Sequence, residues 1–327
     1  MATLKTISLI NSPSGRGQAA LGYLLQYSPF LAWLEGQSGW EIDATDFDYF
    51  PQTISLLSIA SRGIGEGYDA ADLIPGDREV DSLKMTGNSV NIDITHKADA
   101  KRGLRDIPTW FNNELIDRFY NWAIAYENLL FNGSGEANEF KGLNNIFNGE
   151  DDLPGFDGIT GVIDSALAIG DDEDSCDLTS RRNYSKFVEW FYLQLAEVEN
   201  PTALIMAPRM FTRLWTIAKI ETILGEARNF FGQPVPTFNN IPMVPTLATT
   251  LPITELDDAD SPVAETTSIW IMSPGERRFS LVSNSGLQWN DYGTLEGKQS
   301  DQETWEIRAA WKVQRYRSAR RCRNIKV

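Results

Sequence analysis

The segment from about Pro108 to Phe131 constrains the fold of this 327-residue chain more than any other. Its apolar side chains recur in steps of four, three, four and three residues, the spacing of one helix face: Leu115, Phe119, Trp122, Tyr126 and Leu129. Proline stands at the permissive first turn, and Asn132-Gly133 supplies an end. At 1.5 Å per residue, such a helix is about 36 Å long. We therefore expect a rod on which other elements pack.

After this rod, helical patterns alternate with short apolar runs. A second helix is expected over 183–198, ended by Pro201, and MFTRLWTIAKIETIL predicts a third over 210–224. Short strands are expected over 202–208, 241–245 and 268–273. The sequence WEIRAAWKV predicts a long, half-buried strand because every second residue is apolar, namely Trp305, Ile307, Ala309, Trp311 and Val313.

The first 50 residues are expected to form an arm, since NSPSGRG favours irregular backbone. A short helix is expected between Gln18 and Leu34, where leucines recur at near-helical spacing and Pro29 interrupts the run. Such a segment cannot bury its apolar face alone. It packs either against its own subunit or against a neighbouring one, and the sequence does not choose between them.

Two β segments, over 53–62 and 89–95, flank a polar stretch rich in turn residues. This stretch, 63–88, is too long for an ordinary hairpin loop. We interpret it as a protruding β-loop. A surface insertion without order of its own is the alternative.

Composition favours a folded, soluble, intracellular protein. Hydrophobic residues make up 42% and charged residues 23% of the chain, which is ordinary globular usage. No apolar run approaches the roughly 20 residues that span a bilayer, and MATLKTISLINSPSG lacks the features of a secretory signal. The two cysteines, Cys176 and Cys322, are too few for a disulfide framework.

Charge is unevenly distributed along the chain. The net charge of −16 disfavours a primary nucleic-acid reader. Residues 312–327 nevertheless carry seven Lys and Arg and no acid, which leaves the other residues at −23. Candidate basic contacts, on an inner surface or at an interface, are Arg315, Arg317, Arg320, Arg321 and Arg323. The alternative is a solvated strand end, or one whose arginines pair with acidic neighbours.

Signatures of catalysis and of cofactor or metal binding are weak, so neither is expected. The single histidine, His96, excludes two-histidine metal sites. SGRGQAALG lacks the Lys-Ser or Lys-Thr pair of a phosphate loop, and the acidic run at 170–177 lacks the pattern of a calcium loop. A hydrolase with two carboxylates assembled by folding stays open, because such pairs leave no local signature.

The order of these segments resembles the tailed-bacteriophage major capsid family. In that family, a strand, an extended loop and a returning strand precede a long spine helix and a small glycine turn. Here the corresponding run is TISLLSIASRGIGEG, SVNIDIT, PTWFNNELIDRFYNWAIAYENLLFNGSG and EFKGLNN. ENPTALIMAPRMFTRLW, FFGQPVPTFNNIPMVP and the final long strand follow in the same order, so the resemblance covers nearly the whole chain.

The resemblance implies an α+β, Hong Kong 97-like capsid fold. Its expected parts are an N-terminal arm (1–52), an extended loop with flanking strands (53–95), a peripheral domain (96–200) with the spine helix at 108–131, an axial domain (201–275), and a return to the peripheral domain that ends in a long strand (276–327). Charges of both signs on and beside the loop are suited to fixing the register of one subunit against the next. The candidate intersubunit contacts are Arg62, Glu66, Asp69, Asp77, Arg78 and Glu79.

The implied function is an icosahedral shell, built of hexamers and pentamers of this chain around double-stranded DNA. It would be assembled in the host bacterial cytoplasm and form part of the virion. The implied partners are a portal protein, a separate scaffold or decoration protein, and packaged DNA held by non-specific electrostatics. The expected loop tip has no lysine, and Lys84 lies toward the returning strand, so the cross-linking lysine of some family members is not expected. An encapsulin-like compartment shares the fold and is the nearest alternative.

Overall fold

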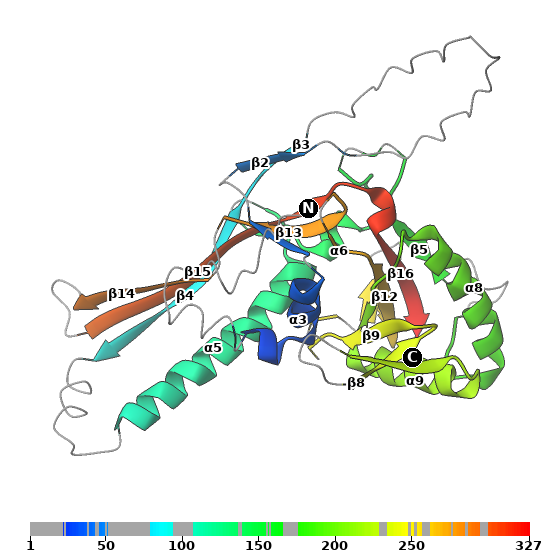
Figure 1. The fold of residues 1–327 in the computed structure, drawn as a ribbon, viewed down its shortest axis with the longest axis horizontal. Helices are drawn as coiled ribbons and strands as arrows, with labels where there is room; N and C mark the ends of the chain where they lie inside the picture. Colours follow the sequence, from blue (N-terminus) through cyan, green and yellow to red (C-terminus); the bar gives the residue numbers. More distant parts are fainter. Residues whose placement is uncertain are drawn as a thin grey trace, which may run out of the picture.

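A computed structural model of the chain describes residues 22, 24–37, 39–42, 46–49, 51, 79–93, 107–136, 139–154, 156, 158–165, 176–228, 234–247, 250–251, 254–256, 262–275, 277–284, 287–294 and 300–327. The strand expected at 53–62, most of the expected loop, and His96 lie outside these residues. No helix in the described ranges is long and apolar enough to cross a membrane. Figure 1 shows a long helix that runs beside a group of long strands, and a second sheet that is flanked by two helices.

The long helix is α5 (Ile107–Asn132), which confirms the expected rod at 108–131 to within a residue at each end. Its buried stripe comprises Phe119, Trp122, Ala123, Tyr126 and Leu130. The helix ends at Gly133, whose N–H donates to Leu129 O at 2.9 Å. A Cβ added to Gly133 would lie 2.1 Å from Phe140 O, so only glycine lets the chain turn this tightly against its neighbour.

A five-stranded sheet packs beside α5. Its strands are β1 (Trp40–Ile42), β4 (Lys84–Asp93), β13 (Phe279–Ser283), β14 (Gln288–Thr294) and β15 (Ser300–Val313). The strand expected at 305–313 is confirmed as part of β15, which pairs with β4, β13 and β14. The returning strand begins at Lys84 rather than at 89, because residues 84–88 already pair with β15. The expected loop is therefore shorter at its C-terminal end.

The second sheet has seven strands, in the order β5 (Val162–Asp164), β16 (Ala319–Lys326), β12 (Thr266–Met272), β6 (Ala203–Met206), β9 (Ile241–Pro245), β8 (Pro234–Phe238) and β7 (Leu224–Arg228). Alternate residues of β12 face opposite cores. Trp270 and Met272 pack in the core that contains α5, whereas Ile269 and Ile271 pack with α8 (Tyr184–Glu197) and α9 (Pro208–Ile220). Both faces of this sheet are thus covered, as its continuous apolar strands require.

One sequence expectation fails beside this sheet. The helix expected at 210–224 is α9, which ends at Ile220; Thr222 has φ 58°, a left-handed conformation that a helix does not continue through, and Leu224 opens β7. Residues 319–326 form β16, which lies between β5 and β12. The division of the chain into domains stays a prediction.

The N-terminal helix packs against its own subunit. Residues 24–27 are helical, and α3 (Pro29–Gly36) follows after Ser28, whose Oγ accepts from Leu31 N at 3.1 Å and caps the helix. Pro29 begins a helix here rather than only interrupting one. Leu24, Phe30 and Leu34 are fully buried in the core around α5. Of the two alternatives for this segment, the described residues show packing on the body.

The remaining elements are short. They are β2 (Asp46–Tyr49), β3 (Glu79–Ser82), α6 (Leu143–Ile146), β10 (Thr254–Leu256), β11 (Pro262–Ala264), and the 3-10 turns η1 (Arg181–Asn183) and η2 (Tyr316–Ser318). The helix expected at 183–198 is confirmed by η1 and α8.

Candidate functional site

The base of the expected loop is closed by two paired strands. β2 and β3 are antiparallel, with Tyr49 opposite Glu79 and Asp46 opposite Ser82, so the chain leaves and returns at the same place. Tyr49 is buried against Val282 and Ala310, with Leu83 packed beside them. The five-stranded sheet therefore anchors both ends of the segment 50–78.

Of the six candidate loop contacts, only Glu79 belongs to the described residues, at the first position of β3. Arg62, Glu66, Asp69, Asp77 and Arg78 lie outside them. The intersubunit role of all six stays a prediction. The structure adds that Glu79 stands at the anchored base, whereas the other five stand in the segment that this base delimits.

A buried carboxylate joins three segments of the chain at the middle of the molecule. Glu127, on α5, is fully buried. It accepts hydrogen bonds from the Ser28 hydroxyl, from Leu247 N at 2.7 Å and from Thr250 Oγ1 at 2.9 Å. Burial raises the pKa of Glu127, against the opposing effect of these hydrogen bonds. The carboxylate thus ties the cap of α3 and the chain after β9 to the long helix.

The sequence reasoning missed Glu127, although a signal was present. Glu127 lies four residues after Ala123 and three before Leu130, within the apolar stripe that predicted the helix. An acid in such a stripe needs hydrogen-bond donors from elsewhere in the fold, because a buried carboxylate without them is too costly.

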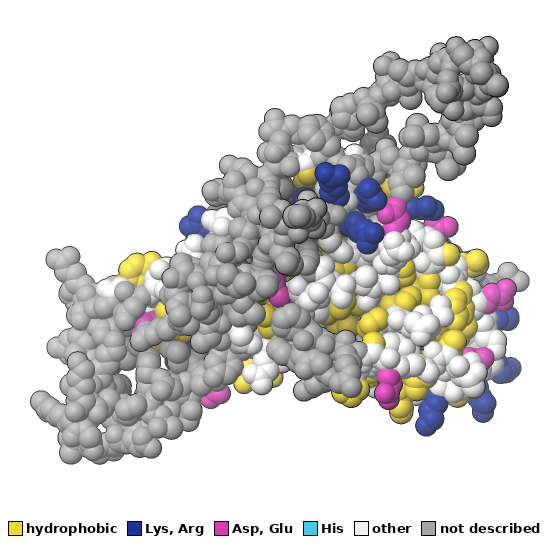
Figure 2. All heavy atoms as spheres, in the orientation of Figure 1, with side chains coloured by type: hydrophobic (Ala, Val, Ile, Leu, Met, Phe, Trp, Pro, Cys, Tyr) yellow, Lys and Arg dark blue, Asp and Glu magenta, His cyan; other side chains and the backbone are white. Residues whose placement is uncertain are grey.

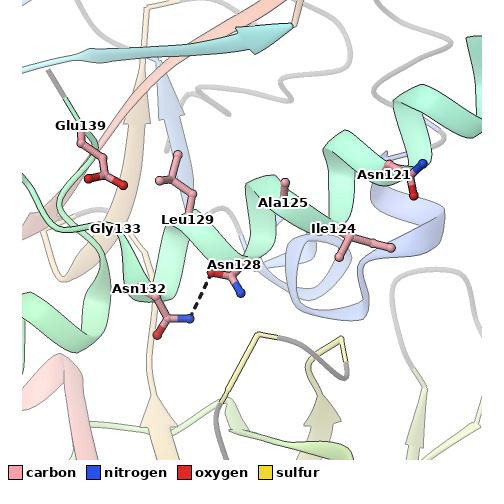
Figure 3. Close-up of a pocket in the computed structure, with 8 residues that line it drawn as sticks. All are labelled: Asn121, Ile124, Ala125, Asn128, Leu129, Asn132, Gly133 and Glu139. Atoms are coloured by element: carbon pink, nitrogen blue, oxygen red, sulfur yellow. Dashed lines mark hydrogen bonds between the residues drawn. The ribbon is translucent and has the colours of Figure 1, made fainter.

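An open cavity of about 350 Å³ lies along the flank of α5 (Figure 3). Asn121, Ala125, Asn128 and Asn132 line it from successive turns of the helix. Asn132 Nδ2 donates to Asn128 Oδ1 at 3.3 Å and to Thr250 O at 2.6 Å. Among the described residues, the only lining carboxylate is that of Glu139, which accepts from the Ser134 hydroxyl.

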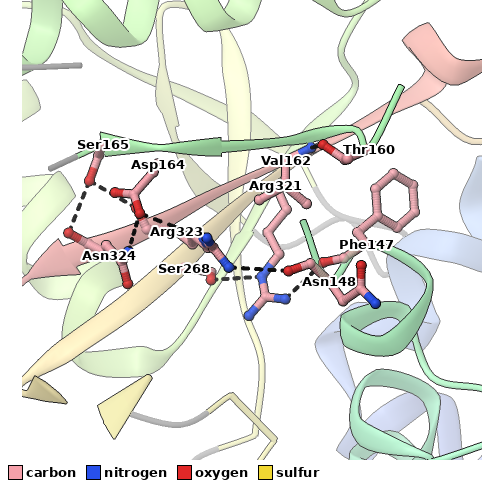
Figure 4. Close-up of polar contacts among 10 residues, drawn as sticks. All are labelled: Phe147, Asn148, Thr160, Val162, Asp164, Ser165, Ser268, Arg321, Arg323 and Asn324. Carbon is pink, nitrogen blue, oxygen red and sulfur yellow. Dashed lines mark hydrogen bonds and ion pairs between the residues drawn. The ribbon is translucent and has the colours of Figure 1, made fainter. Parts of the chain in front are cut away.

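Two of the candidate arginines hold the seven-stranded sheet to the turn after α6 (Figure 4). Arg321 donates to Phe147 O at 2.9 Å, to Asn144 O at 3.3 Å and to Ser268 Oγ at 3.0 Å, and its guanidinium lies 5.7 Å from the Trp270 ring centre. Arg323 donates to Asn148 O at 3.1 Å and lies 3.7 Å from Asp164 Oδ2. Both guanidinium groups therefore contact carbonyl or carboxylate oxygens of their own subunit.

The other three candidate arginines lie near the end of α8. Arg315 pairs with Glu199 at 3.1 Å, and Arg317 and Arg320 lie 3.3 and 4.0 Å from the same Glu197 oxygen. The described arginines of this tail thus have acidic or carbonyl partners within the subunit, the alternative that the sequence left open. Their contacts with other molecules stay a prediction.

The described residues contain no cluster of three potential metal ligands. Cys176 and Cys322 are buried, and burial raises the pKa of each thiol to about 12, so neither is a thiolate at neutral pH. The cavity beside α5 is lined by one carboxylate, Glu139, and a second cavity near η2 also by one, Glu197. Neither brings together the pair that the hydrolase alternative requires.

No protein-family model matches the sequence, and no curated protein does. Solved structures do match the fold. The holo-SrpI encapsulin complex from Synechococcus elongatus PCC 7942 has a TM-score of 0.57 and 14% identity, over 90% of this chain and 88% of that one. The capsid of an empty GTA particle has a TM-score of 0.52 and 14% identity, over 90% and 88%. The satellite phage P4 procapsid, which includes a size determination (Sid) protein, has 0.50 and 13%, over 100% and 94%.

These likenesses cover nearly the whole of each chain, and they establish the fold. The chain has the mixed helix-and-sheet, Hong Kong 97-like fold that the order of its segments predicted. At 13–14% identity they carry no residue-level role from one protein to the other.

Proposed function

We propose that this chain is the major capsid protein of a tailed phage, which self-assembles as hexamers and pentamers into an icosahedral shell around double-stranded DNA. The observation that carries the proposal is a fold shared, over 88–94% of their length, with subunits of a GTA capsid, a phage procapsid and an encapsulin complex. The anchored base at β2 and β3 supports it, because it presents one long segment of chain from a fixed point of the body.

The proposal includes partners other than this chain. A portal protein and a separate scaffold or decoration protein are expected, and the P4 procapsid is a case in which a size-determining protein accompanies the shell. Packaged DNA is expected to make only non-specific electrostatic contacts with the shell. The net charge of −16 disfavours a dedicated nucleic-acid reader. Assembly would occur in the host bacterial cytoplasm, and the product would reside in the virion.

The role is structural rather than enzymatic. The structures that share the fold belong to shells and particles. Neither a cofactor nor a metal enters the proposal.

An encapsulin-like compartment is the second candidate, and the likeness to the SrpI encapsulin complex favours it. The two candidates differ in contents. A phage shell encloses DNA, whereas an encapsulin-type shell encloses protein cargo. Nuclease-protected DNA of uniform length in particles from infected cells would favour the phage shell, and a copurifying enzyme without DNA would favour the compartment.

Electron microscopy of the purified chain, with and without its neighbouring gene products, tests the proposal. We expect pentameric and hexameric rings or irregular shells from the chain alone, and closed shells of one size when a scaffold is present. Closed shells of uniform size from the chain alone would remove the separate scaffold from the proposal. A monomer under all conditions would contradict the shell itself.

A further inference from the structure

A second cavity, of about 220 Å³, lies where η2 leads into β16. Its walls are the loop 158–162, the end of α8 and residues 316–320. Two guanidinium groups, of Arg317 and Arg320, share the cavity with one carboxylate, that of Glu197. At neutral pH these three side chains carry a net charge of +1. Figure 2 shows Lys and Arg side chains gathered near η2, the red turn between β15 and β16 in Figure 1.

The two guanidinium groups have donors to spare. Each arginine offers five N–H donors. Arg317 donates to Glu197 at 3.3 Å, and Arg320 lies 4.0 Å from the same oxygen, beyond hydrogen-bond distance. The Nε atoms of both are buried and have no hydrogen-bond partner among the described residues, so an entering group would meet the terminal Nη atoms rather than Nε. Arg321 differs, because its donors reach two carbonyl oxygens and a hydroxyl.

The cavity is accessible from solvent but recessed. The side chains of Arg317 and Arg320 are 37% and 25% exposed, and that of Glu197 is 51% exposed. Tyr316 and Val198 give it an apolar lining beside the charges. A carboxylate that entered would meet guanidinium groups that are partly shielded from water, where charge-assisted hydrogen bonds are stronger than on an open surface.

The shape distinguishes between anionic partners. Duplex DNA is a wide rod that pairs its phosphates with protruding Lys and Arg side chains. A cavity of about 220 Å³ with recessed arginines fits a single side chain on a polypeptide instead. A copy of this chain offers such side chains in abundance, because its residues outside 312–327 carry a charge of −23.

We propose that this cavity binds an acidic side chain of a second copy of this chain, through bidentate contacts with Arg317 and Arg320. The inference rests on the proposed function, because a shell places copies of the chain side by side. Such a contact fixes register between neighbours, and it weakens as salt screens the charges. It gives part of the basic tail an intersubunit role, whereas the donors of Arg321 already reach oxygens of their own subunit.

A peptide-binding experiment tests this with the full-length, unassembled chain. The probe is a fluorescent peptide, GDDEDS, which is the acid-richest run of the sequence, residues 170–175. A neutral counterpart, GNNQNS, controls for sequence-independent binding. Fluorescence anisotropy should show binding of GDDEDS at low salt, and at least about tenfold weaker binding of GNNQNS, the factor that about 1.4 kcal/mol of charge-assisted bonding supplies.

Three variants assign the binding to the cavity. The double change Arg317→Ala with Arg320→Ala should weaken binding of the GDDEDS peptide by about tenfold or more. Glu197→Gln removes the competing carboxylate without a change in shape, so it should strengthen binding, and it stays informative if the double variant misfolds. Arg209→Ala is the matched control. Arg209, on α9, makes an exposed ion pair with Glu265, and its loss should leave peptide binding within about twofold.

The outcomes separate this inference from the proposed function. Equal binding of the acidic and neutral peptides would overturn the proposed role of the cavity, even if particles form. So would an equal loss of peptide affinity in the Arg209 control. A short DNA duplex that competes with the peptide, and depends equally on Arg317 and Arg320, would make the site a nucleic-acid contact and overturn the carboxylate assignment. Peptide binding by a chain that never forms particles would leave the cavity standing and refute the shell.

Discussion

Substitution of Glu127 tests how the N-terminal helix is held on the long helix. Glu127→Ala removes the acceptor for the Leu247 N–H and for the hydroxyls of Ser28 and Thr250, all within a fully buried site. Each buried donor left without a partner costs about 1–3 kcal/mol. The two hydroxyls can rotate toward other acceptors and the buried charge is lost, so we expect a net loss of about 2–4 kcal/mol in the free energy of unfolding.

Glu127→Gln is the matched variant, because it keeps the shape and one acceptor oxygen while it removes the charge. Burial raises the pKa of Glu127 above its ordinary value of 4.5, so the folded state binds its proton more tightly than the unfolded state. The stability that the protonated carboxyl contributes is therefore present below that ordinary value, and it is lost as pH rises through the raised folded pKa. The free energy of unfolding of Glu127→Gln, minus that of the wild type, should increase as pH rises over this window.

Urea unfolding of unassembled subunits, followed by tryptophan fluorescence at about pH 5 and about pH 8, measures both effects. Comparison of the two proteins at each pH cancels the titration of the other acids. A difference between Glu127→Gln and the wild type that does not change with pH would refute the linkage. Wild-type stability in Glu127→Ala would refute the role of the carboxylate in the fold.

Three further substitutions follow from single contacts. Gly133→Ala places a Cβ 2.1 Å from Phe140 O and should lower the free energy of unfolding by more than about 2 kcal/mol in the same urea assay. Gly22→Ala, whose Cβ meets no atom within 4 Å, should cost less. Trp311→Phe loses the bond from Nε1 to Leu130 O at 2.9 Å and should cost about 1–3 kcal/mol, with little change in the circular dichroism of the native state. Arg321→Lys cannot reach the Asn144 and Phe147 carbonyls together and should cost more than Arg209→Lys at an exposed ion pair; equal thermal midpoints would contradict the bracing role of Arg321.

The local elements were predictable from sequence where periodicity was long and uninterrupted. The apolar stripe from Leu115 to Leu129 predicted α5, and the alternation from Trp305 to Val313 predicted most of β15. The order of segments predicted the fold, which the solved structures confirm. In α5 and β15, one face of the element packs against a core, so the apolar residues recur at the helix or strand period in the sequence itself.

The features that failed depend on long-range pairing. Residues 319–326 are basic at alternate and adjacent positions, which concealed a strand that lies between β5 and β12. Their arginines can lie in the sheet because they contact carbonyl oxygens after α6 and the carboxylate of Asp164. The carbonyl partners are 174 and 175 residues away in sequence, and Asp164 is about 160 residues away. The same holds for Glu127, whose donors come from two distant segments, at Ser28 and at 247–250. No local window contains such information.

The central claim is that copies of this chain form a closed shell, and cryo-electron microscopy of particles from cells that express the whole gene cluster tests it most directly. The account predicts a closed icosahedral shell in which each subunit has the two-sheet body described above, with residues 50–78 extending from the β2–β3 base over an adjacent copy. A chain that stays at its monomer mass of 36.7 kDa at high concentration, with residues 50–78 packed on its own body, would contradict it.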